Sequence, residues 1–358
     1  MKKKKSEIIL PLLVLILLLL GVLVLASTSA TIAQEHSKSS YYFLRHQVFF
    51  ALIPGVILAF FFTKIPLSFL KNNSFPLLIL NLLFCGLVFL PQFTKEFSGA
   101  NRWIGLGPVS LQPSEFLKVT FLIYLAAWLT KKRKSKESLM GFFAILFPIA
   151  LLFILQPDIS TLGVIAASAI TMYFLSETSF WHIMLIVIIG LVVLFSLTKT
   201  APYRLARLTT FLRPKLDPLG SGFQISQSLI AIGSGGLFGK GFGLSAQKLG
   251  FLPGVLSDSI FAVFAEETGF LGASILISLF LIFLLRGMTI SKRTKNEFLR
   301  LLCLGITSWI TLQAFVNIGA MTGIFPLTGI PLPFISYGGS HLVAELIGIG
   351  ILLNIARS

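Results

Sequence analysis

Repeated apolar runs of about 20 residues constrain this chain more than any other feature. The first extends from Ile8 to Ala26, and others follow along the 358 residues. A helix needs about 20 apolar residues to cross a bilayer, whereas a transmembrane β-strand has about 10 residues of alternating polarity. We therefore predict an all-α polytopic membrane protein with about ten transmembrane helices. Their expected positions are 8–26, 43–63, 75–92, 114–130, 140–156, 160–176, 180–197, 260–286, 299–320 and 337–356.

Composition agrees with this prediction and excludes a soluble protein. Only 12% of the residues are charged and 55% are apolar, while a soluble domain has about 25% charged residues. The lysines at 2–5, followed by an apolar run, also resemble a cleaved signal peptide. We favour a first transmembrane helix, because the run is longer than a typical signal sequence and further spans follow it.

Positive charge predicts the orientation in the membrane. Lys and Arg number 29 against 13 Asp and Glu, which gives a net charge of +16. Cytoplasmic loops are enriched in Lys and Arg, and clusters of these residues occur at 2–5, 131–136 and 292–295. We expect both termini to be cytoplasmic, with 198–259 as one long extracytoplasmic loop between spans seven and eight. Residues 1–358 then form a single integral membrane domain, whose positive charge suits anionic lipids rather than nucleic acid.

Metal and nucleotide sites find little support in the sequence. The four histidines are scattered, and Cys85 and Cys303 lie inside apolar runs, so neither set has metal-ligand spacing. The glycine-rich stretch 233–241 resembles a phosphate-binding loop, but it lacks the Walker spacing and a preceding strand. We therefore expect no metal site and no cofactor from these residues, while a requirement for a divalent cation stays open.

Ionisable residues at membrane depth are costly and therefore point to function. Glu115 and Lys118 share one face of the fourth expected span. They either bind a ligand or mark a helix start, with Lys118 extended toward the interface. Asp158 either has a functional role or caps the sixth span. The adjacent carboxylates Glu266 and Glu267 have three open interpretations, which are pairing with arginines, lining a hydrated cavity and catalysis.

Asp258 is the strongest catalytic candidate. It immediately precedes the eighth expected span, on the side of the membrane where the long loop lies. The loop cations Arg207, Lys240 and Lys248 are expected on that same side. A carboxylate among cations at a lipid surface suits a phosphate-bearing substrate with a hydroxyl group to be deprotonated. The alternative is a helix N-cap.

A series of motifs then points to a known family. The motifs are Gly99-Ala-Asn-Arg102-Trp103-Ile, Gln112-Pro-Ser-Glu115-Phe-Leu-Lys118, Gln156-Pro-Asp158, Asp217-Pro-Leu-Gly-Ser-Gly222, Gln227-Ser-Leu-Ile-Ala-Ile-Gly-Ser-Gly-Gly236, Ala265-Glu-Glu-Thr-Gly269, Asn317-Ile-Gly319 and Gly329-Ile-Pro-Leu-Pro-Phe-Ile-Ser-Tyr-Gly-Gly-Ser340. In this order they resemble the SEDS family (shape, elongation, division and sporulation), the membrane peptidoglycan glycosyltransferases. The resemblance covers nearly the whole chain. The stretches 41–47, 224–229 and 241–253 are more similar to the division-type FtsW subgroup than to the elongation-type RodA subgroup.

The family's catalytic aspartate corresponds to Asp258, but its surroundings differ here. Gly254, Leu256, Ser257 and Ser259 depart from the usual pattern, so the family's glutamate, imidazole and aromatic ring are missing. We therefore expect the hydrogen bonds around Asp258 to differ from those of other members.

The resemblance implies that the protein polymerises lipid II, a disaccharide-pentapeptide on undecaprenyl pyrophosphate, at the outer face of a bacterial cytoplasmic membrane. In this interpretation Asp258 is the general base, while Arg102, Lys118 and Arg207 position the pyrophosphate or the glycan. Glu115 orients Lys118. Residues expected to support the site are Asp158, Gln227, Glu266 and Glu267.

The resemblance also implies partners, and it leaves other functions to be weighed. The expected partners are a class B penicillin-binding protein, which supplies the transpeptidase, and other divisome proteins, together with membrane lipids. A flippase for lipid-linked precursors is the main alternative, although a transporter's key groups are expected near the bilayer midplane. A structural scaffold for division and an elongation-type polymerase are further alternatives.

The predicted orientation can be tested by cysteine labelling. In a chain without its two native cysteines, Lys215→Cys should react with a membrane-impermeant reagent added outside the cell, whereas Ser135→Cys should be protected, because Lys and Arg crowd the loop around position 135. Protection of position 215 in the folded protein would contradict this topology.

Overall fold

The structure is a computed structural model that describes residues 2–35, 39–97, 100–106, 109–132, 138–176, 180–200, 202–213 and 220–358. Within these residues, five helices are long and apolar enough to cross a membrane. Four shorter apolar helices coincide with further expected spans. The prediction of a helical polytopic membrane protein is therefore confirmed, while the count of ten spans stays a prediction. Both positions chosen for labelling, 135 and 215, lie outside the described residues.

The helices occur where the apolar runs predicted them. Residues 42–62 form one continuous helical stretch with a π-helical turn, η1 (Val48–Leu52), between α2 and α3. Pro54, two residues after this turn, lacks an N–H group, which explains the irregular hydrogen bonding there. The remaining helices of the first half are α1 (Lys2–Glu35), α2 (Tyr42–Gln47), α3 (Ile53–Phe62), α4 (Leu67–Asn72), α5 (Ser74–Gly86), the 3-10 turn η2 (Leu87–Phe89), α6 (Pro113–Lys132) and α7 (Ser138–Leu155).

The second half contains two helices inside the segment predicted as a long loop. These are α10 (Pro202–Leu212) and α11 (Ser221–Ser234). They are too short to cross a bilayer, which agrees with a place outside the membrane. The other helices are α8 (Ile159–Leu175), α9 (Phe180–Thr200), α12 (Ile260–Arg293), α13 (Glu297–Met321) and α14 (Gly339–Arg357).

A small antiparallel sheet corrects the expectation of an all-α chain. Its strands are β1 (Thr94–Phe97), β2 (Ala100–Leu106) and β3 (Val109–Leu111), in the order β1-β2-β3. Ile104 of β2 pairs with Leu111 of β3. The strands are too short and too mixed in polarity to give an alternating pattern in the sequence, so they were not predicted.

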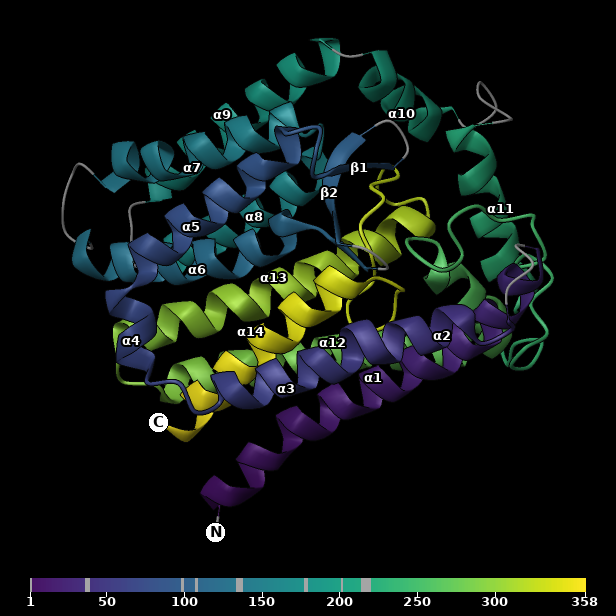
Figure 1. The fold of residues 1–358 in the computed structure, drawn as a ribbon, viewed down its shortest axis with the longest axis horizontal. Helices are drawn as coiled ribbons and strands as arrows, with labels where there is room; N and C mark the ends of the chain where they lie inside the picture. The colour runs from purple at the N-terminus through teal and green to yellow at the C-terminus, as the bar shows by residue number, and fades with distance from the viewer. Residues whose placement is uncertain are drawn as a thin grey trace.

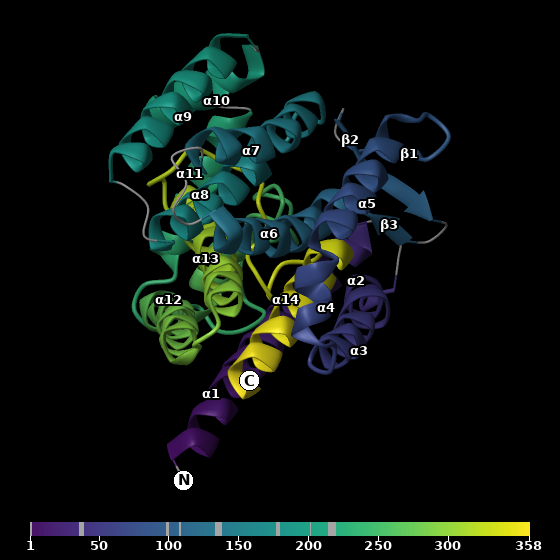
Figure 2. The same cartoon turned by 90° about the vertical axis from the view of Figure 1, so that its left-hand side faces the viewer.

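The interior is built around α13 and α14. Helix α13 packs against α12 on one side and against α6 and α8 on the other, while α14 packs against α3. Figures 1 and 2 show α13 and α14 between the α5–α9 layer and the α1–α3 layer. The start of α1 and the end of α14 lie toward the same end of the molecule, and α10 and α11 lie toward the opposite end (Figure 1).

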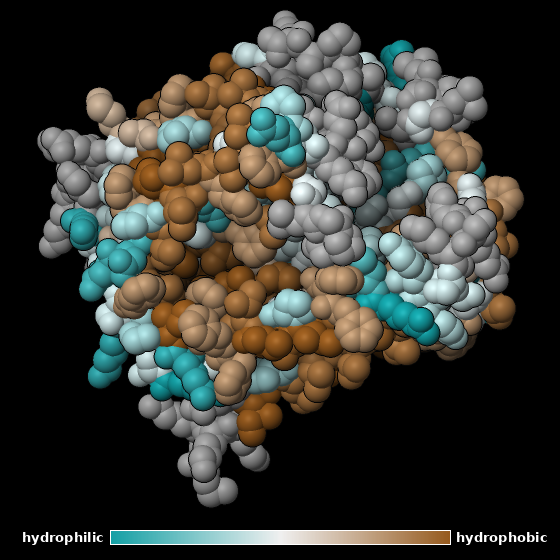
Figure 3. Space-filling model, in the orientation of Figure 1, coloured by the Kyte–Doolittle hydropathy of each residue, from teal (hydrophilic) through white to brown (hydrophobic). Residues whose placement is uncertain are grey.

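Apolar side chains cover much of the outer surface. Figure 3 shows brown, hydrophobic residues over most of the coloured part of the visible face. Large exposed residues include Phe60, Leu80, Leu83 and Phe147, each at least 62% exposed. A soluble protein rarely presents so large an apolar surface, whereas lipid tails cover it without penalty.

Helix α12 is interrupted at Gly269, and the glycine-rich stretch 233–241 packs against the interruption. Gly269 has φ 69° and ψ −168°, a backbone conformation open essentially only to glycine. The carbonyl groups of Glu266 and Glu267 accept hydrogen bonds from the backbone N–H groups of Lys240 and Gly241. Two N–H groups of the glycine-rich stretch are therefore engaged by the helix break and do not point to a phosphate.

The backbone conformation at Gly269 predicts that a substitution there lowers the stability of the fold, whereas a substitution at an unconstrained helical glycine does not. Gly269→Ala should lower the unfolding temperature, because the conformation alone costs about 1–3 kcal/mol for other residues and the new Cβ would lie 2.3 Å from the Gly239 nitrogen. Gly190→Ala is the control, since its Cβ meets no atom within 4 Å. Thermal unfolding in detergent distinguishes the two, and equal unfolding temperatures would contradict the strain at Gly269.

Candidate active site

Asp258 lies in the turn that leads into α12, and neutral side chains hold its carboxylate. Oδ1 accepts a hydrogen bond from Ser257 Oγ at 3.0 Å, and Oδ2 accepts one from Gln224 Nε2 at 3.1 Å. Gln224 belongs to α11 and also donates to Ser259 Oγ at 2.9 Å. The carboxylate is half-buried, and no described lysine or arginine forms an ion pair with it.

The alternative that Asp258 caps α12 does not match this geometry. The N-cap residue is Ser259, and it makes no side-chain cap bond. Gly254 opens space for the carboxylate instead, because a Cβ at this position would lie 2.3 Å from Asp258 Oδ1. A larger residue at position 254 would therefore have to displace the Asp258 carboxylate.

The backbone of the Asp258 turn is attached to residues 330–338, which we call the 330–338 segment. Asn317 Nδ2 on α13 donates both to the Asp258 carbonyl at 2.8 Å and to the Ile330 carbonyl at 2.7 Å. Ser336 Oγ donates to the Ser257 carbonyl. Tyr337 N donates to the Leu256 carbonyl at 2.7 Å. The position of Asp258 therefore depends on this segment.

Glu115 and Lys118 form a buried ion pair inside the helical bundle. Lys118 Nζ lies 2.6 Å from Glu115 Oε2, and the two residues are only 2–3% exposed. The ammonium also donates to Gln313 Oε1 at 2.9 Å and lies 5.1 Å from the centre of the Trp309 ring. The interpretation that Lys118 extends toward the interface is wrong, while Glu115 does contact Lys118 as the sequence suggested.

Glu266 and Glu267 anchor the long loop to α12, and their partners are lysines instead of arginines. Lys240 Nζ lies 2.6 Å from Glu266 Oε1, and Lys248 Nζ lies 2.9 Å from Glu267 Oε1. Ser27 of α1 donates to Glu267 Oε1 as well, at 2.6 Å. Two of the cations expected around a substrate are therefore bound by these carboxylates.

Arg102 and Asp158 meet at a turn that follows α7. Arg102 Nε donates to the Gln156 carbonyl at 2.9 Å, another guanidinium nitrogen donates to the Pro157 carbonyl, and Nη1 lies 3.7 Å from Asp158 Oδ1. Asp158 caps α8 through the N–H and hydroxyl groups of Thr161. The capping interpretation of Asp158 is thus confirmed, and 31% of the Arg102 side chain stays exposed.

The remaining candidates from the sequence are Arg207 and Gln227. Arg207 lies exposed on α10, and Gln227 is half-buried on α11. Within the described chain, neither makes a hydrogen bond or ion pair with Asp258. Gln224, one helical turn before Gln227, makes that contact instead. Sequence reasoning noted Asn317 only as part of a family motif and missed Gln313, although amides deep in an apolar helix could have signalled a buried hydrogen-bond network.

The described residues contain no group of three His, Cys, Asp or Glu side chains that could hold a metal ion.

Comparison with known proteins identifies the family. The FtsW/RodA/SpoVE family, described as "Cell cycle protein", matches residues 8–358. The chain belongs to this family.

Relatives and a solved structure support the assignment over most of the chain. Stage V sporulation protein E of Bacillus subtilis is 39% identical over 322 residues, which cover 89% of this chain and 88% of that protein. A probable peptidoglycan glycosyltransferase FtsW of Coxiella burnetii is 38% identical, covering 88% and 86%. A solved structure described as "Structural coordination of polymerization and crosslinking by a peptidoglycan synthase complex" has a TM-score of 0.81 and 28% identity, covering 97% of this chain and 96% of that chain.

The buried ion pair gives a prediction for this FtsW/RodA/SpoVE family member. Lys118→Met should destabilise the protein by about 3–5 kcal/mol, because it leaves the Glu115 carboxylate buried without its cation. The double variant Glu115→Gln/Lys118→Met removes both charges and should unfold at a temperature closer to that of the wild type. Thermal unfolding in detergent measures both. A double variant less stable than Lys118→Met would contradict the pairing.

Proposed function

We propose that this chain is a peptidoglycan glycosyltransferase that polymerises lipid II at the outer face of a bacterial cytoplasmic membrane. The observation that carries the proposal is the Asp258 carboxylate, which is partly exposed, held by the neutral donors Ser257 and Gln224, and not paired with a described cation. A carboxylate in this state can accept a proton from a sugar hydroxyl. Relatives named as peptidoglycan glycosyltransferases support the same activity.

Asp258 is the general base of the proposed reaction. The acceptor hydroxyl attacks the anomeric carbon of the donor sugar, its proton passes to the Asp258 carboxylate, and the bond from that carbon to the pyrophosphate oxygen breaks. Undecaprenyl pyrophosphate leaves with the bonding electrons. The pyrophosphate is already a good leaving group, so a general acid is less necessary than in glycoside hydrolysis.

Cations with exposed surface are the groups we assign to the pyrophosphate. Arg207 is exposed, and the side chains of Lys240 and Arg102 retain 37% and 31% exposure while holding their partners. Charge of this kind stabilises the developing negative charge on the leaving group. Lys118 and Glu115 are buried, so we assign them an indirect role in fixing α6 against α13.

We further propose a role in cell division with a class B penicillin-binding protein as partner. The FtsW names of relatives and the synthase complex among similar structures support this assignment. The partner supplies the crosslinking reaction, and other divisome proteins and membrane lipids complete the assembly. The multi-pass fold fits the cytoplasmic membrane, and both termini face the cytoplasm if the charge distribution sets the orientation.

Asp258→Asn tests the assignment of the base. Asn keeps an oxygen that accepts from Gln224, so folding and membrane insertion should be preserved. It cannot take up the hydroxyl proton, so polymerisation should fall by about 10²–10⁴-fold. The measurement uses the protein in proteoliposomes with its partner and purified lipid II. The matched control Glu297→Gln changes a carboxylate at the far end of α13, where it pairs with Arg300, and should retain activity.

Near wild-type polymerisation by Asp258→Asn would place the base elsewhere. Transfer of lipid II across the vesicle membrane without any polymer, in wild type and variant alike, would instead support the flippase alternative.

A further inference from the structure

The buried polar network extends beyond the ion pair to a second carboxylate, Glu345 of α14. Gln313 connects them: its Oε1 accepts from Lys118 Nζ and Trp309 Nε1, each at 2.9 Å. Its Nε2 donates to Glu345 Oε1 at 3.3 Å and to the Pro331 carbonyl at 3.1 Å. Gln313 and Glu345 are both 0% exposed. The hydrogen bonds that join Gln313 to Lys118, Trp309 and Glu345 are buried, which raises the cost of losing one, while the bond to the Pro331 carbonyl is partly buried.

The second oxygen of Glu345 holds an unusual backbone conformation. Oε2 accepts from the backbone N–H of Phe334 at 2.9 Å. Phe334 has φ 63°, a left-handed conformation that costs a bulky residue about 1–3 kcal/mol and persists only where its surroundings fix it. Glu345 supplies one such constraint, at the centre of the 330–338 segment.

This segment is the same one that holds the Asp258 turn. Ser336 and Tyr337, the second and third residues after Phe334, hydrogen bond to the carbonyls of Ser257 and Leu256. Gln313 and Asn317 lie one turn apart on α13, and both donate to the segment. A change in the conformation of Phe334 would therefore move the groups that position Asp258.

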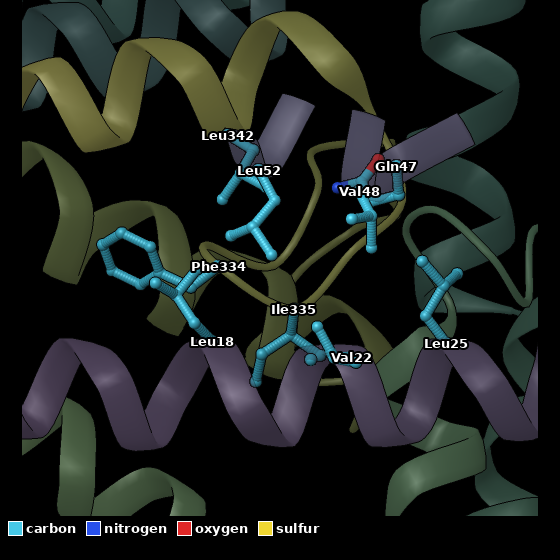
Figure 4. A pocket seen from close by; sticks show the side chains of 10 residues that line it. Leu18, Val22, Leu25, Gln47, Val48, Leu52, Phe334, Ile335 and Leu342 are labelled. Atoms are coloured by element: carbon cyan, nitrogen blue, oxygen red, sulfur yellow. The ribbon is translucent and has the colours of Figure 1, made fainter. Parts of the chain in front are cut away.

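The opposite side of the segment packs against α1 and α2. A Cβ on Gly21 would lie 2.3 Å from the Phe334 carbonyl oxygen, so the backbones are in close contact. Figure 4 shows Phe334 and Ile335 facing Leu18 and Val22 of α1 across a small apolar pocket. Gln47 accepts from Gly338 N at 3.0 Å. Apolar packing thus supports one side of the segment, and Glu345 and Gln313 support the other through hydrogen bonds.

We propose that Gln313 and Glu345 are positioning residues for Asp258, which act by fixing the 330–338 segment in the conformation that orients the Asp258 turn. This inference rests on the proposed role of Asp258 as general base. Neither residue touches the reacting atoms. Because they orient the proposed base, we expect their loss to lower the rate of the chemical step.

An exchange of the two side chains tests the proposal. In Glu345→Gln, the new NH₂ group faces another donor, which is either Gln313 Nε2 or the Phe334 N–H. In Gln313→Glu, two carboxylates face each other, so acceptor meets acceptor. Each single variant should lower kcat by on the order of 10–10²-fold, the effect of a small misplacement of a catalytic group, with little change in the KM for lipid II. The double variant Gln313→Glu/Glu345→Gln restores the donor–acceptor match between the two residues, while losing the bond to Pro331, and should recover part of kcat.

Hydrogen–deuterium exchange on the full protein in proteoliposomes gives a readout that does not depend on activity. Peptides covering 254–259 and 330–338 should exchange faster in each single variant and return toward wild type in the double variant. Glu297→Gln is the matched control and should leave both peptides and kcat unchanged.

The outcomes separate the two proposals. Unchanged exchange at 254–259 in both single variants, or lost stability with kcat unchanged per folded molecule, would overturn the positioning role. Faster exchange at 254–259 with restoration in the double variant supports the coupling. If that pattern is found but the wild type makes no polymer, the proposed polymerase function fails while the structural coupling stands.

Discussion

The need to pair every polar group inside an apolar bundle governs this structure. A buried donor or charge without a partner costs several kcal/mol, so protein partners for such groups strongly favour the folded arrangement. The contacts from Glu115 through Lys118 and Gln313 to Glu345 meet this need across α6, α13 and α14. Because these partners come from three helices and one irregular segment, satisfying them also fixes how those elements sit together.

Two non-helical stretches gain their shape from this requirement. Backbone that is not helical keeps its shape where its N–H and C=O groups find protein partners. The 330–338 segment is held by Gln313, Asn317 and Glu345. The glycine-rich stretch occupies the break in α12, where Lys240 N–H meets the Glu266 carbonyl. Asp258 lies between these two stretches in the sequence, and its backbone carbonyl accepts a hydrogen bond from Asn317, which also holds the 330–338 segment. The position of the Asp258 turn therefore depends on the same buried amide that holds this segment.

Sequence alone predicted the parts of the fold that depend on local pattern. Apolar runs located the helices, and positions next to expected spans singled out Asp258 and Asp158. Sequence did not predict which side chains from separate elements meet. Lys240 and Lys248 pair with Glu266 and Glu267, and Gln224, not Gln227, contacts Asp258. Such pairs are set by how helices pack and where α12 breaks, neither of which follows from spacing along one helix. The three short strands were missed for a different reason, because they lack a periodic pattern.

The most direct test of the account is a mass balance on purified lipid II. The wild-type protein, reconstituted in proteoliposomes with a class B penicillin-binding protein whose transpeptidase is inactivated, should convert lipid II into glycan chains. One undecaprenyl pyrophosphate should be released for each glycosidic bond formed, and both products are measurable by chromatography and mass spectrometry. Lipid II recovered intact, with neither glycan nor released carrier, would contradict the claim that this chain is a glycosyltransferase.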